Sequence, residues 1–179
     1  MKTQIVFGSC YGTTRAYAQR LSELTGVSAE SWKSIQNLTN CECLIYLGGL
    51  YAGGIEGLKQ TLKKPGAQNL KRILLVTVGL ADPQAPDTTM HIHQEAYKQI
   101  PSELFDKIEF FHLRGGIDYA HLNFKHKMMM KMLITYLKRQ PLEKREAQTQ
   151  MMLDTYGQKI DFVDFDTLHP IIEAMKGEK

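Results

Sequence analysis

The sequence contains runs of apolar residues that end in glycine, and these runs limit the folds open to the chain. Gln4–Phe7 precedes Gly8, Cys43–Leu47 precedes Gly48, and Ile73–Val78 precedes Gly79. Short apolar runs without polar alternation are typical of strands that are buried on both faces, as in a parallel sheet. The sequence therefore predicts an α/β fold, in which helices cover the two faces of a parallel sheet.

Two further strands and four helices complete the predicted fold. A weaker strand is expected at residues 27–32 and a fifth at residues 108–113. The helices follow from the spacing of apolar residues. The first runs from Thr13 to Gly26 with Tyr17, Leu21 and Leu24 on one face, and the second is marked by Ile55, Leu58 and Leu62 and ends at Pro65-Gly66. The third runs from Thr88 or Thr89 to Ile100, and the last from Asp164 or Asp166 through Met175. With right-handed crossovers, the five parallel strands fit a three-layer sandwich with sheet order 2-1-3-4-5.

Length and composition predict a single domain, residues 1–179, with an extended excursion at about 115–165 before the last helix. No apolar run reaches the ~18 residues of a membrane-spanning helix, and the apolar stretch at the start is too short for a signal peptide. The three cysteines, Cys10, Cys41 and Cys43, are too few for a disulfide framework. We therefore expect reduced thiols and a cytoplasmic protein.

The first loop, residues 9–14, follows a predicted strand and has the composition of a phosphate site. Backbone N–H groups at a helix N-terminus attract anions, and Gly12 permits a close approach. Ser9, Thr13 and Thr14 can donate hydrogen bonds. The loop lacks the lysine of a Walker loop and the Gly-x-Gly-x-x-Gly spacing of dinucleotide folds. A monophosphate bound without metal fits best, and an ordinary N-cap turn is the alternative.

Three more loops of small residues follow predicted strands, at residues 48–54, 78–83 and 114–119. Because the carboxyl ends of parallel strands share one edge of a sheet, these loops should meet the first loop there. Their glycines leave the backbone open to a planar ligand, and Tyr51 offers a ring for stacking. Each loop alone fits a simple turn equally well. Together the loops predict a site for a flat ligand that carries a phosphate.

The loop residues also carry a resemblance to a known family. Phe7-x-Ser9-x-x-Gly12-x-Thr14-Arg15 resembles the phosphate loop of flavodoxin-like proteins, and most closely that of the branch with menaquinone-dependent protoporphyrinogen oxidase. Leu47–Gly53 is similar to the second flavin loop of that branch. Arg114–Tyr119, followed by Leu122-Asn123-Phe124 and a Met-rich helix, is similar to its segment after the fifth strand, and Val163-Asp164-Phe165 to the entry of its last helix. The resemblance covers nearly the whole chain and implies a flavodoxin-like sandwich, FMN as cofactor and redox chemistry.

The resemblance further implies which residues bind FMN, and it implies no catalytic side chain and no metal site. The phosphate would be held by Ser9, Tyr11, Gly12, Thr13 and Thr14, with Cys10 in contact through its backbone. The isoalloxazine would be lined by Leu50, Tyr51, Ala52 and Gly53. The pocket would be closed by Gly79, Leu80 and Ala81, and near its rim would lie Gly115, Gly116 and Tyr119.

Three functions stay open at this point. The first is an FMN-binding electron carrier with a redox partner protein or a quinone as partner. The second is a flavin-dependent oxidase or dehydrogenase that acts on a protoporphyrinogen or a quinone, and the third is a flavin-free interaction module. The net charge of +3 also differs from the strong acidity of typical flavodoxins. A reduced flavin should therefore meet less repulsion here and have a higher potential.

The segment at residues 119–142 holds five basic side chains, no acidic one and four of the chain's methionines. Phe124, Met128, Met132 and Leu133 fall at helical spacing, with Lys125, Lys127 and Lys131 between them. One interpretation is a helix packed on the domain with its lysines in water. The other is a surface for a partner protein, a quinone or the inner face of a membrane, contacted peripherally beside the flavin. Nucleic-acid binding is not expected, because five basic charges without a recognised module are a small footprint.

The remaining cysteines and histidines give weaker signals. Cys10 stands at a helix N-terminus, where the pKa of a thiol tends to fall, but no histidine is placed beside it, so we expect a small pocket residue. Cys41 and Cys43 are too few for a zinc site. We interpret His91-Ile92-His93 as the solvated start of a helix, and His112 has no recognisable ligand spacing.

Overall fold

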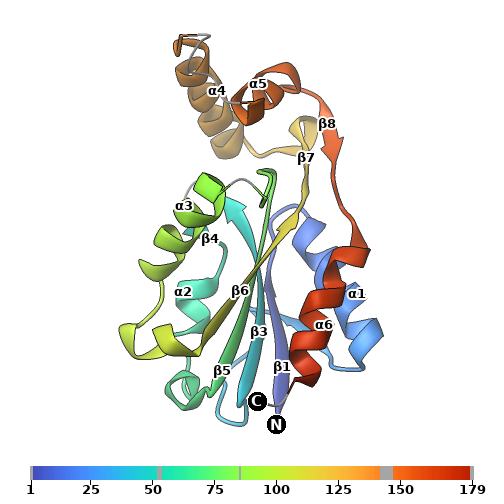
Figure 1. Cartoon of the computed structure of the whole chain (residues 1–179), viewed down its shortest axis with the longest axis vertical. Helices are drawn as coiled ribbons and strands as arrows, with labels where there is room; N and C mark the ends of the chain where they lie inside the picture. Colours follow the sequence, from blue (N-terminus) through green and yellow to red (C-terminus); the bar gives the residue numbers. More distant parts are fainter. Residues whose placement is uncertain (1, 52–53, 85, 142–146, 178–179) are drawn as a thin grey trace.

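The computed structural model describes residues 2–51, 54–84, 86–141 and 147–177. Five strands form a parallel sheet in the order β2-β1-β3-β5-β6 (Figure 1). Their bounds are β1 (Thr3–Gly8), β2 (Ala29–Ser31), β3 (Cys43–Tyr51), β5 (Arg72–Gly79) and β6 (Ile108–Arg114). This is the 2-1-3-4-5 order expected from the sequence, so the prediction of a flavodoxin-like α/β sandwich is confirmed.

Helices cover both faces of this sheet (Figure 1). On one face lie α1 (Thr13–Thr25) and α6 (His169–Lys176), the latter preceded by the 3-10 helix η5 (Phe165–Leu168). On the other face lie α2 (Leu58–Thr61) and α3 (Pro86–Tyr97), with the 3-10 helices η1 (Ala67–Asn69) and η2 (Ser102–Lys107). The middle layer is thus enclosed, and the loops at the ends of the strands remain accessible.

The predicted helix at Ile55 begins in the wrong place. Ile55 belongs to the short strand β4 (Gly54–Ile55), which pairs antiparallel with the end of β3. The helix begins only at Leu58, because Gly57 takes a left-handed φ of 75° and interrupts the chain direction. Ile55 is buried in the observed strand and would also be buried in the predicted helix, so apolar spacing alone could not separate the two.

Other boundaries also shift. β3 continues through Gly48 to Tyr51, where a loop was expected, because Gly48 still pairs with Gly8 of β1 and Thr77 of β5. A Cβ atom at Gly48 would lie 2.1 Å from Ile55 Cγ2, so glycine is needed for β4 to pack there. Helix α3 ends at Tyr97 rather than Ile100 and starts before Thr88. Leu24, placed on the buried face of α1, is 48% exposed.

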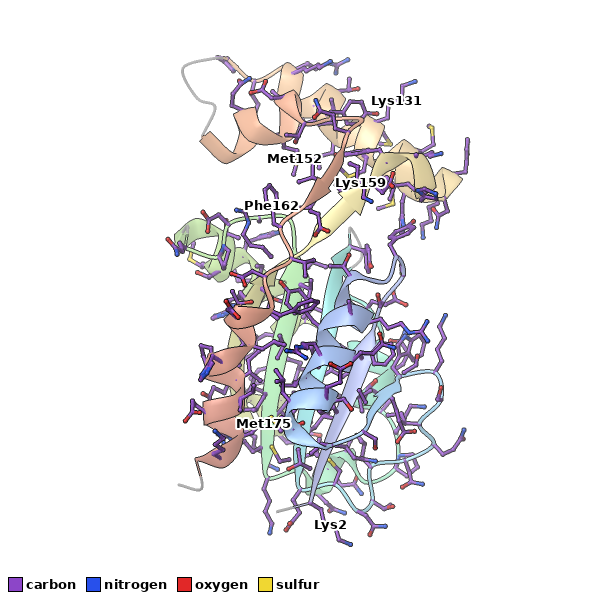
Figure 2. The ribbon with its side chains drawn as sticks, turned by 90° about the vertical axis from the view of Figure 1, so that its right-hand side faces the viewer. Lys2, Lys131, Met152, Lys159, Phe162 and Met175 are labelled. Atoms are coloured by element: carbon purple, nitrogen blue, oxygen red, sulfur yellow. The ribbon has the colours of Figure 1, made fainter. Side chains whose placement is uncertain are left out.

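After β6 the chain leaves the sheet for the excursion that the sequence predicts. This segment contains β7 (Gly116–Asp118), η3 (Tyr119–His121), α4 (Phe124–Lys138), α5 (Ala147–Asp154) and β8 (Lys159–Asp161). β7 and β8 pair antiparallel, a ribbon that the sequence analysis missed. Figures 1 and 2 show α4 and α5 beyond the carboxyl ends of the strands, at the opposite end of the molecule from Lys2 and both termini.

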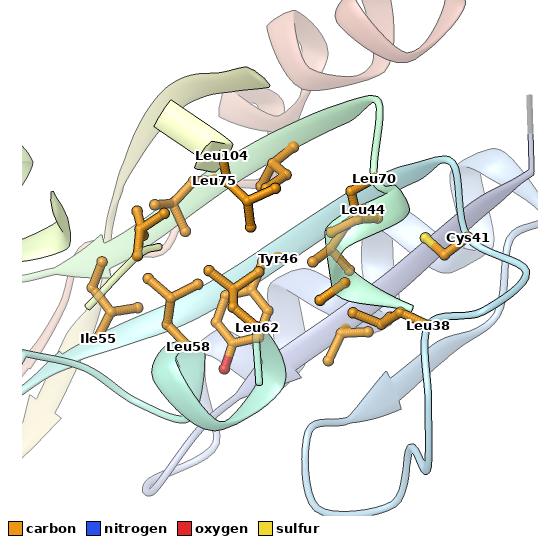
Figure 3. Close-up of a cluster of buried hydrophobic side chains, with 14 of the residues drawn as sticks. Leu38, Cys41, Leu44, Tyr46, Ile55, Leu58, Leu62, Leu70, Leu75 and Leu104 are labelled. Carbon is orange, nitrogen blue, oxygen red and sulfur yellow. The ribbon is translucent and has the colours of Figure 1, made fainter. Parts of the chain in front are cut away.

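The side chains of β3 alternate between two buried clusters. Leu44 and Tyr46 belong to the cluster under α2 and α3, which Figure 3 shows in close-up. Ile45 and Leu47 belong to the cluster under α1 and α6. All four side chains are fully buried. Burial on both faces accounts for the missing polar alternation, and it leaves the ends of the strands as the place for a ligand.

Tyr17 of α1 joins this core to both ends of the excursion. Its buried hydroxyl donates a hydrogen bond to the Arg114 carbonyl at 2.8 Å and accepts one from the Asp164 N–H at 2.9 Å. Burial raises the pKa of the phenol, which keeps the donating proton in place. The Arg114 guanidinium lies 3.8 Å from the centre of the Phe162 ring, where the two chain segments meet.

Replacing Tyr17 should therefore destabilise the fold. Tyr17→Phe leaves the Arg114 carbonyl and the Asp164 N–H without this partner in a part-buried position. We expect the free energy of unfolding to fall by ~1–3 kcal/mol, measured by urea denaturation. Tyr136→Phe is the control, because Tyr136 is 63% exposed. Equal midpoints for Tyr17→Phe and the unmodified chain would show that the hydroxyl contributes nothing.

Candidate functional site

The loop between β1 and α1 presents the N-terminus of a 13-residue helix. Gly12 is the N-cap residue, with a left-handed φ of 97° that favours glycine, and a Cβ atom there would meet nothing within 4 Å. Among the described residues no side chain caps this N-terminus, and the first turn carries no acidic residue. Ser9 Oγ accepts the Gly12 N–H at 3.1 Å and so shapes the loop. An anion can approach the first-turn N–H groups from the open side.

Tyr51 turns back from the end of β3 toward this loop. Its hydroxyl accepts the Cys10 N–H at 3.0 Å, and burial raises the pKa of the phenol to about 12. Burial also raises the pKa of the Cys10 thiol, with the nearby charge of Glu56 as a second cause. Cys10 therefore stays protonated and lacks the features of an activated nucleophile. This agrees with the expectation that Cys10 has no catalytic role, but Cys10 is exposed in the loop and does not line the cavity as a pocket residue would.

A cavity of about 490 Å³ opens at the carboxyl edge of the sheet, between the strand ends and the excursion. Its size falls within the roughly 300–1,000 Å³ of small-molecule sites. The cavity brings together ten of the residues predicted from the sequence, which are Tyr11, Thr13, Thr14, Leu50, Tyr51, Gly79, Leu80, Ala81, Gly115 and Gly116. The prediction that four separate loops meet at one edge of the sheet thus agrees with the geometry.

The other predicted site residues lie elsewhere. Ser9, Cys10 and Gly12 belong to the phosphate loop but do not line the cavity. Tyr119 packs edge-on against Tyr156, with ring centres 5.2 Å apart. It borders a small hollow that shares Leu80, Ala81 and Met152 with the cavity, so it lies next to the cavity without lining it. Ala52 and Gly53 are outside the described residues.

The excursion supplies a second half of the cavity that the sequence analysis did not anticipate. Its wall is formed by Ile117, Leu122, Met129, Met130, Leu133 and Met152, here named the apolar annex. The sequence grouped Phe124, Met128, Met132 and Leu133 on one helix face. The first three side chains are exposed rather than packed, and of the four only Leu133 lines the cavity. The face of α4 that lines the cavity is the neighbouring one, which carries His126, Met129, Met130 and Leu133. A run of adjacent methionines offers both faces equally, so the sequence could not indicate which would turn inward.

An aromatic cluster links the two halves of the cavity. The His126 ring of α4 stacks parallel to the Tyr51 ring, with centroids 5.5 Å apart. His126 Nδ1 also shares a hydrogen bond with the Tyr11 hydroxyl, at 2.5 Å. Tyr51 was expected to offer its ring to a ligand, and in this structure His126 is its stacking partner. The hydroxyl–imidazole pair places a group at the cavity wall that can hold and pass a proton.

Two further histidines come together beneath α3. His93 Nε2 lies 3.0 Å from His112 Nε2, and His112 Nδ1 lies 2.7 Å from Thr77 Oγ1. His93 stacks on Phe110, so its interpretation as part of a solvated helix start is wrong, because β6 places an aromatic ring under α3. Burial lowers the pKa of His112 to about 4 and also lowers that of His93. No group of three or more potential metal ligands occurs in the described ranges.

The comparison with known families settles the relationship of the chain. A family model with the description "Flavodoxin domain" matches residues 4–143. The chain belongs to the flavodoxin domain family. No curated protein matches it. Membership of this family supports FMN as the cofactor, in agreement with the sequence analysis.

Solved structures similar to this flavodoxin-family chain are distant. A flavodoxin from the domain Archaea is 13% identical, with a TM-score of 0.43 and coverage of 74% of this chain and 93% of its own. A mutant flavodoxin of Fusobacterium nucleatum bound to flavin mononucleotide is 15% identical, with a TM-score of 0.40 and coverage of 63% and 75%. A mutant flavodoxin of Pseudomonas aeruginosa is 18% identical, with a TM-score of 0.39 and coverage of 76% and 96%. At this distance we take no residue's role from them.

The histidine pair beneath α3 should make stability depend on pH. The pKa of His112 falls from an ordinary value of 6.5 to about 4 on folding, so the unfolded chain binds the proton more readily. The free energy of unfolding should therefore fall as the pH drops from 6.5 toward 4. The groups that face His112 are His93, Thr77 and Phe110.

Urea denaturation at several pH values tests this expectation. His112→Gln should flatten the loss of stability between pH 6.5 and 4, whereas His169→Gln, which removes an exposed histidine, should keep the original slope. The same slope in all three proteins would contradict the assignment.

Proposed function

We propose that this flavodoxin-family chain binds FMN in the cavity at the carboxyl edge of the sheet and transfers electrons. The main observation in support of this proposal is that two features lie next to each other. The uncapped N-terminus of α1 lies beside the cavity, and the end of β3 and the loop after β5 form part of its walls. A phosphate-bearing flat ligand needs both features together.

The residues present fit FMN. A Cβ atom at Gly49 would lie 2.8 Å from the Tyr51 ring and 3.1 Å from Thr14 Oγ1, and one at Gly79 would lie 2.8 Å from Leu50 Cδ1. Larger residues at either position would therefore displace side chains that line the cavity. The first-turn N–H groups of α1 and the Thr13 hydroxyl would hold the phosphate. Leu50, Leu80 and Ala81 would offer apolar surface to the ring system.

FMN, when bound, supplies the electron-transfer chemistry, and the protein supplies binding, orientation and electrostatics. The α1 N-terminus favours the charge of the phosphate. The walls from β3, β5 and the excursion exclude water from the apolar part of the cavity. The Tyr11 and His126 side chains, joined through the phenol oxygen and Nδ1, can hold a proton at the boundary between the flavin loops and the annex.

Flavin fluorescence titration of matched glycine variants tests this proposal. Gly12 and Gly26 stand at the two ends of α1, both have positive φ (97° and 71°), and a Cβ atom at either would meet nothing within 4 Å. Alanine at either position adds the same kind of backbone strain. Gly12→Ala should raise the Kd for FMN about tenfold, which corresponds to ~1.4 kcal/mol, because it reshapes the phosphate loop. Gly26→Ala should leave the Kd unchanged.

The outcomes separate the functions that the sequence left open. Equal losses of affinity in both variants would mean that strain in α1, not the phosphate loop, controls binding. A protein that leaves the fluorescence of added FMN unchanged would favour the flavin-free interaction module.

The apolar annex supports a second candidate, a flavin-dependent oxidase or dehydrogenase of the protoporphyrinogen or quinone type. A carrier that meets a redox partner protein needs only an exposed edge of the flavin. In this chain the cavity continues past the flavin loops into a space lined by Met129, Met130 and Met152, which suits a flat apolar substrate. The resemblance to the menaquinone-dependent protoporphyrinogen oxidase branch points in the same direction.

Two methionines of α4 provide a matched test of this candidate. Met129 lines the annex, whereas Met132, three residues further along α4, does not line the cavity and is 68% exposed. Met129→Glu should lower kcat/KM for a water-soluble quinone at least roughly tenfold, because it places a charge in an apolar space. The same variant should retain the Kd for FMN, and Met132→Glu should retain both values. If the unmodified protein showed no turnover of the quinone, the oxidase or dehydrogenase would be excluded and the electron carrier would remain as the proposed function.

A further inference from the structure

Helix α4 has two apolar faces, and only one of them is covered. His126, Met129, Met130 and Leu133 line the cavity. On the other side Phe124 is 81% exposed, Met128 43%, Met132 68% and Tyr136 63%. Residues four apart on a helix stand in one row, so these four side chains form a continuous apolar row, here named the outer row. Single exposed apolar residues are common, but a row along a whole helix marks a contact surface.

Basic side chains flank the outer row. Lys127 and Lys131 each stand three residues after a member of the row, which places them along its side. Lys125 of α4 and Arg139, its C-cap residue, are also exposed. The sequence holds no acidic residue from 119 to 142, and just before this stretch Asp118 Oδ2 lies 2.9 Å from His121 Nδ1. The Lys127 ammonium donates one hydrogen bond to the Ala120 carbonyl, which fixes it at the start of the row.

The place of α4 in the fold leaves this face free to meet an extended surface. Figure 1 shows α4 at the end of the molecule, beyond the carboxyl edge of the sheet and away from both termini. Figure 2, turned by a quarter, shows Lys131 on the same projecting end. Among the described residues no helix is long and apolar enough to cross a membrane, so any contact with lipid would be a surface contact.

We propose that the exposed face of α4 docks on an anionic membrane surface, with the outer row at the level of the lipid headgroups. Helices that lie in the interface combine aromatic and long apolar side chains with lysine and arginine, whose stems reach past the apolar row to the anionic headgroups. Basic residues beside an anionic leaflet add attraction that salt weakens.

The charge distribution favours this occupant over a second copy of the chain. A symmetric α4–α4 contact would bring the same basic residues of both copies together without an acidic partner on either helix. An anionic bilayer offers opposite charge over the whole length of the helix. The proposal goes beyond the electron-transfer function and does not depend on bound FMN, since no member of the outer row lines the cavity.

Flotation of the full chain with vesicles tests the proposal. The unmodified protein should float with vesicles of equal parts phosphatidylcholine and phosphatidylglycerol, and not with phosphatidylcholine alone. High salt should release most of it. The double variant Lys127→Gln with Lys131→Gln should lower the partition of the protein onto these vesicles by more than tenfold, because each lost charge lowers it about fivefold. Phe124→Ser with Met132→Ser should weaken it by at least roughly tenfold.

Matched controls remove the same groups elsewhere on the surface. Lys59→Gln with Lys63→Gln removes two exposed lysines, also four residues apart, at α2, and Leu24→Ser removes an exposed apolar side chain from α1. Both control variants should float as the unmodified protein does, and circular dichroism checks that every variant is folded.

Four results would overturn the proposal, three of which concern flotation with anionic vesicles and the state of the protein. These three are no flotation with anionic vesicles, equal loss in the α4 variants and their controls, or a dimer in sedimentation equilibrium that Phe124→Ser with Met132→Ser dissociates. The last would assign the outer row to a second copy. Binding that persists on phosphatidylcholine alone would also contradict it, because the basic residues would then have no role.

Discussion

The central strands of the main sheet are buried on both faces, and this requirement for a cover on each side shapes the rest of the molecule. Leu44 and Tyr46 of β3 are buried under α2 and α3, and Ile45 and Leu47 under α1 and α6. With both faces enclosed, the carboxyl ends of the strands are the part of the sheet that a ligand can reach. The phosphate loop, the turn after β5 and the end of β3 meet there because the strands run parallel.

The excursion turns that edge into a cavity. Tyr17 binds the Arg114 carbonyl and the Asp164 N–H, so one buried hydroxyl holds the two ends of a segment of about fifty residues. α4 then presents one face to the cavity and the other to solvent. His126 connects α4 to the flavin loops through Tyr11 and Tyr51. The annex and the outer row are therefore two properties of one segment, and Tyr17 contributes to fixing both of its ends.

The sequence predicted what depends on local pattern. Apolar runs closed by glycine located the strong parallel strands and placed the loops of small residues at one edge of the sheet. The resemblance to flavodoxin-like proteins then named the individual residues, ten of which line the cavity. The sequence analysis failed where a contact between residues far apart in the chain determines the secondary structure. Ile55 is apolar in a helix or a strand, and only its pairing with Leu50 makes it a strand. The β7–β8 ribbon joins segments about forty residues apart, and neither strand has a pattern of its own.

The side-chain clusters show the same limit. His93 and His112 are 19 positions apart and form a pair only because α3 packs over β6. Tyr51 was correctly placed at the site, but its stacking on His126 depends on where α4 lies. For α4 itself, the methionines indicated an amphipathic helix. Which methionines face inward follows from the packing of the excursion on the sheet edge, and sequence spacing carries no information on it.

The visible absorption spectrum of the purified full chain, recorded before and after addition of FMN, tests the central claim most directly. The account predicts flavin bands that shift or sharpen as FMN enters the apolar cavity, with saturation at one FMN per chain. Bands that remain those of free FMN at every protein concentration would contradict it. The cavity would then not be a flavin site, and both redox functions would be excluded together.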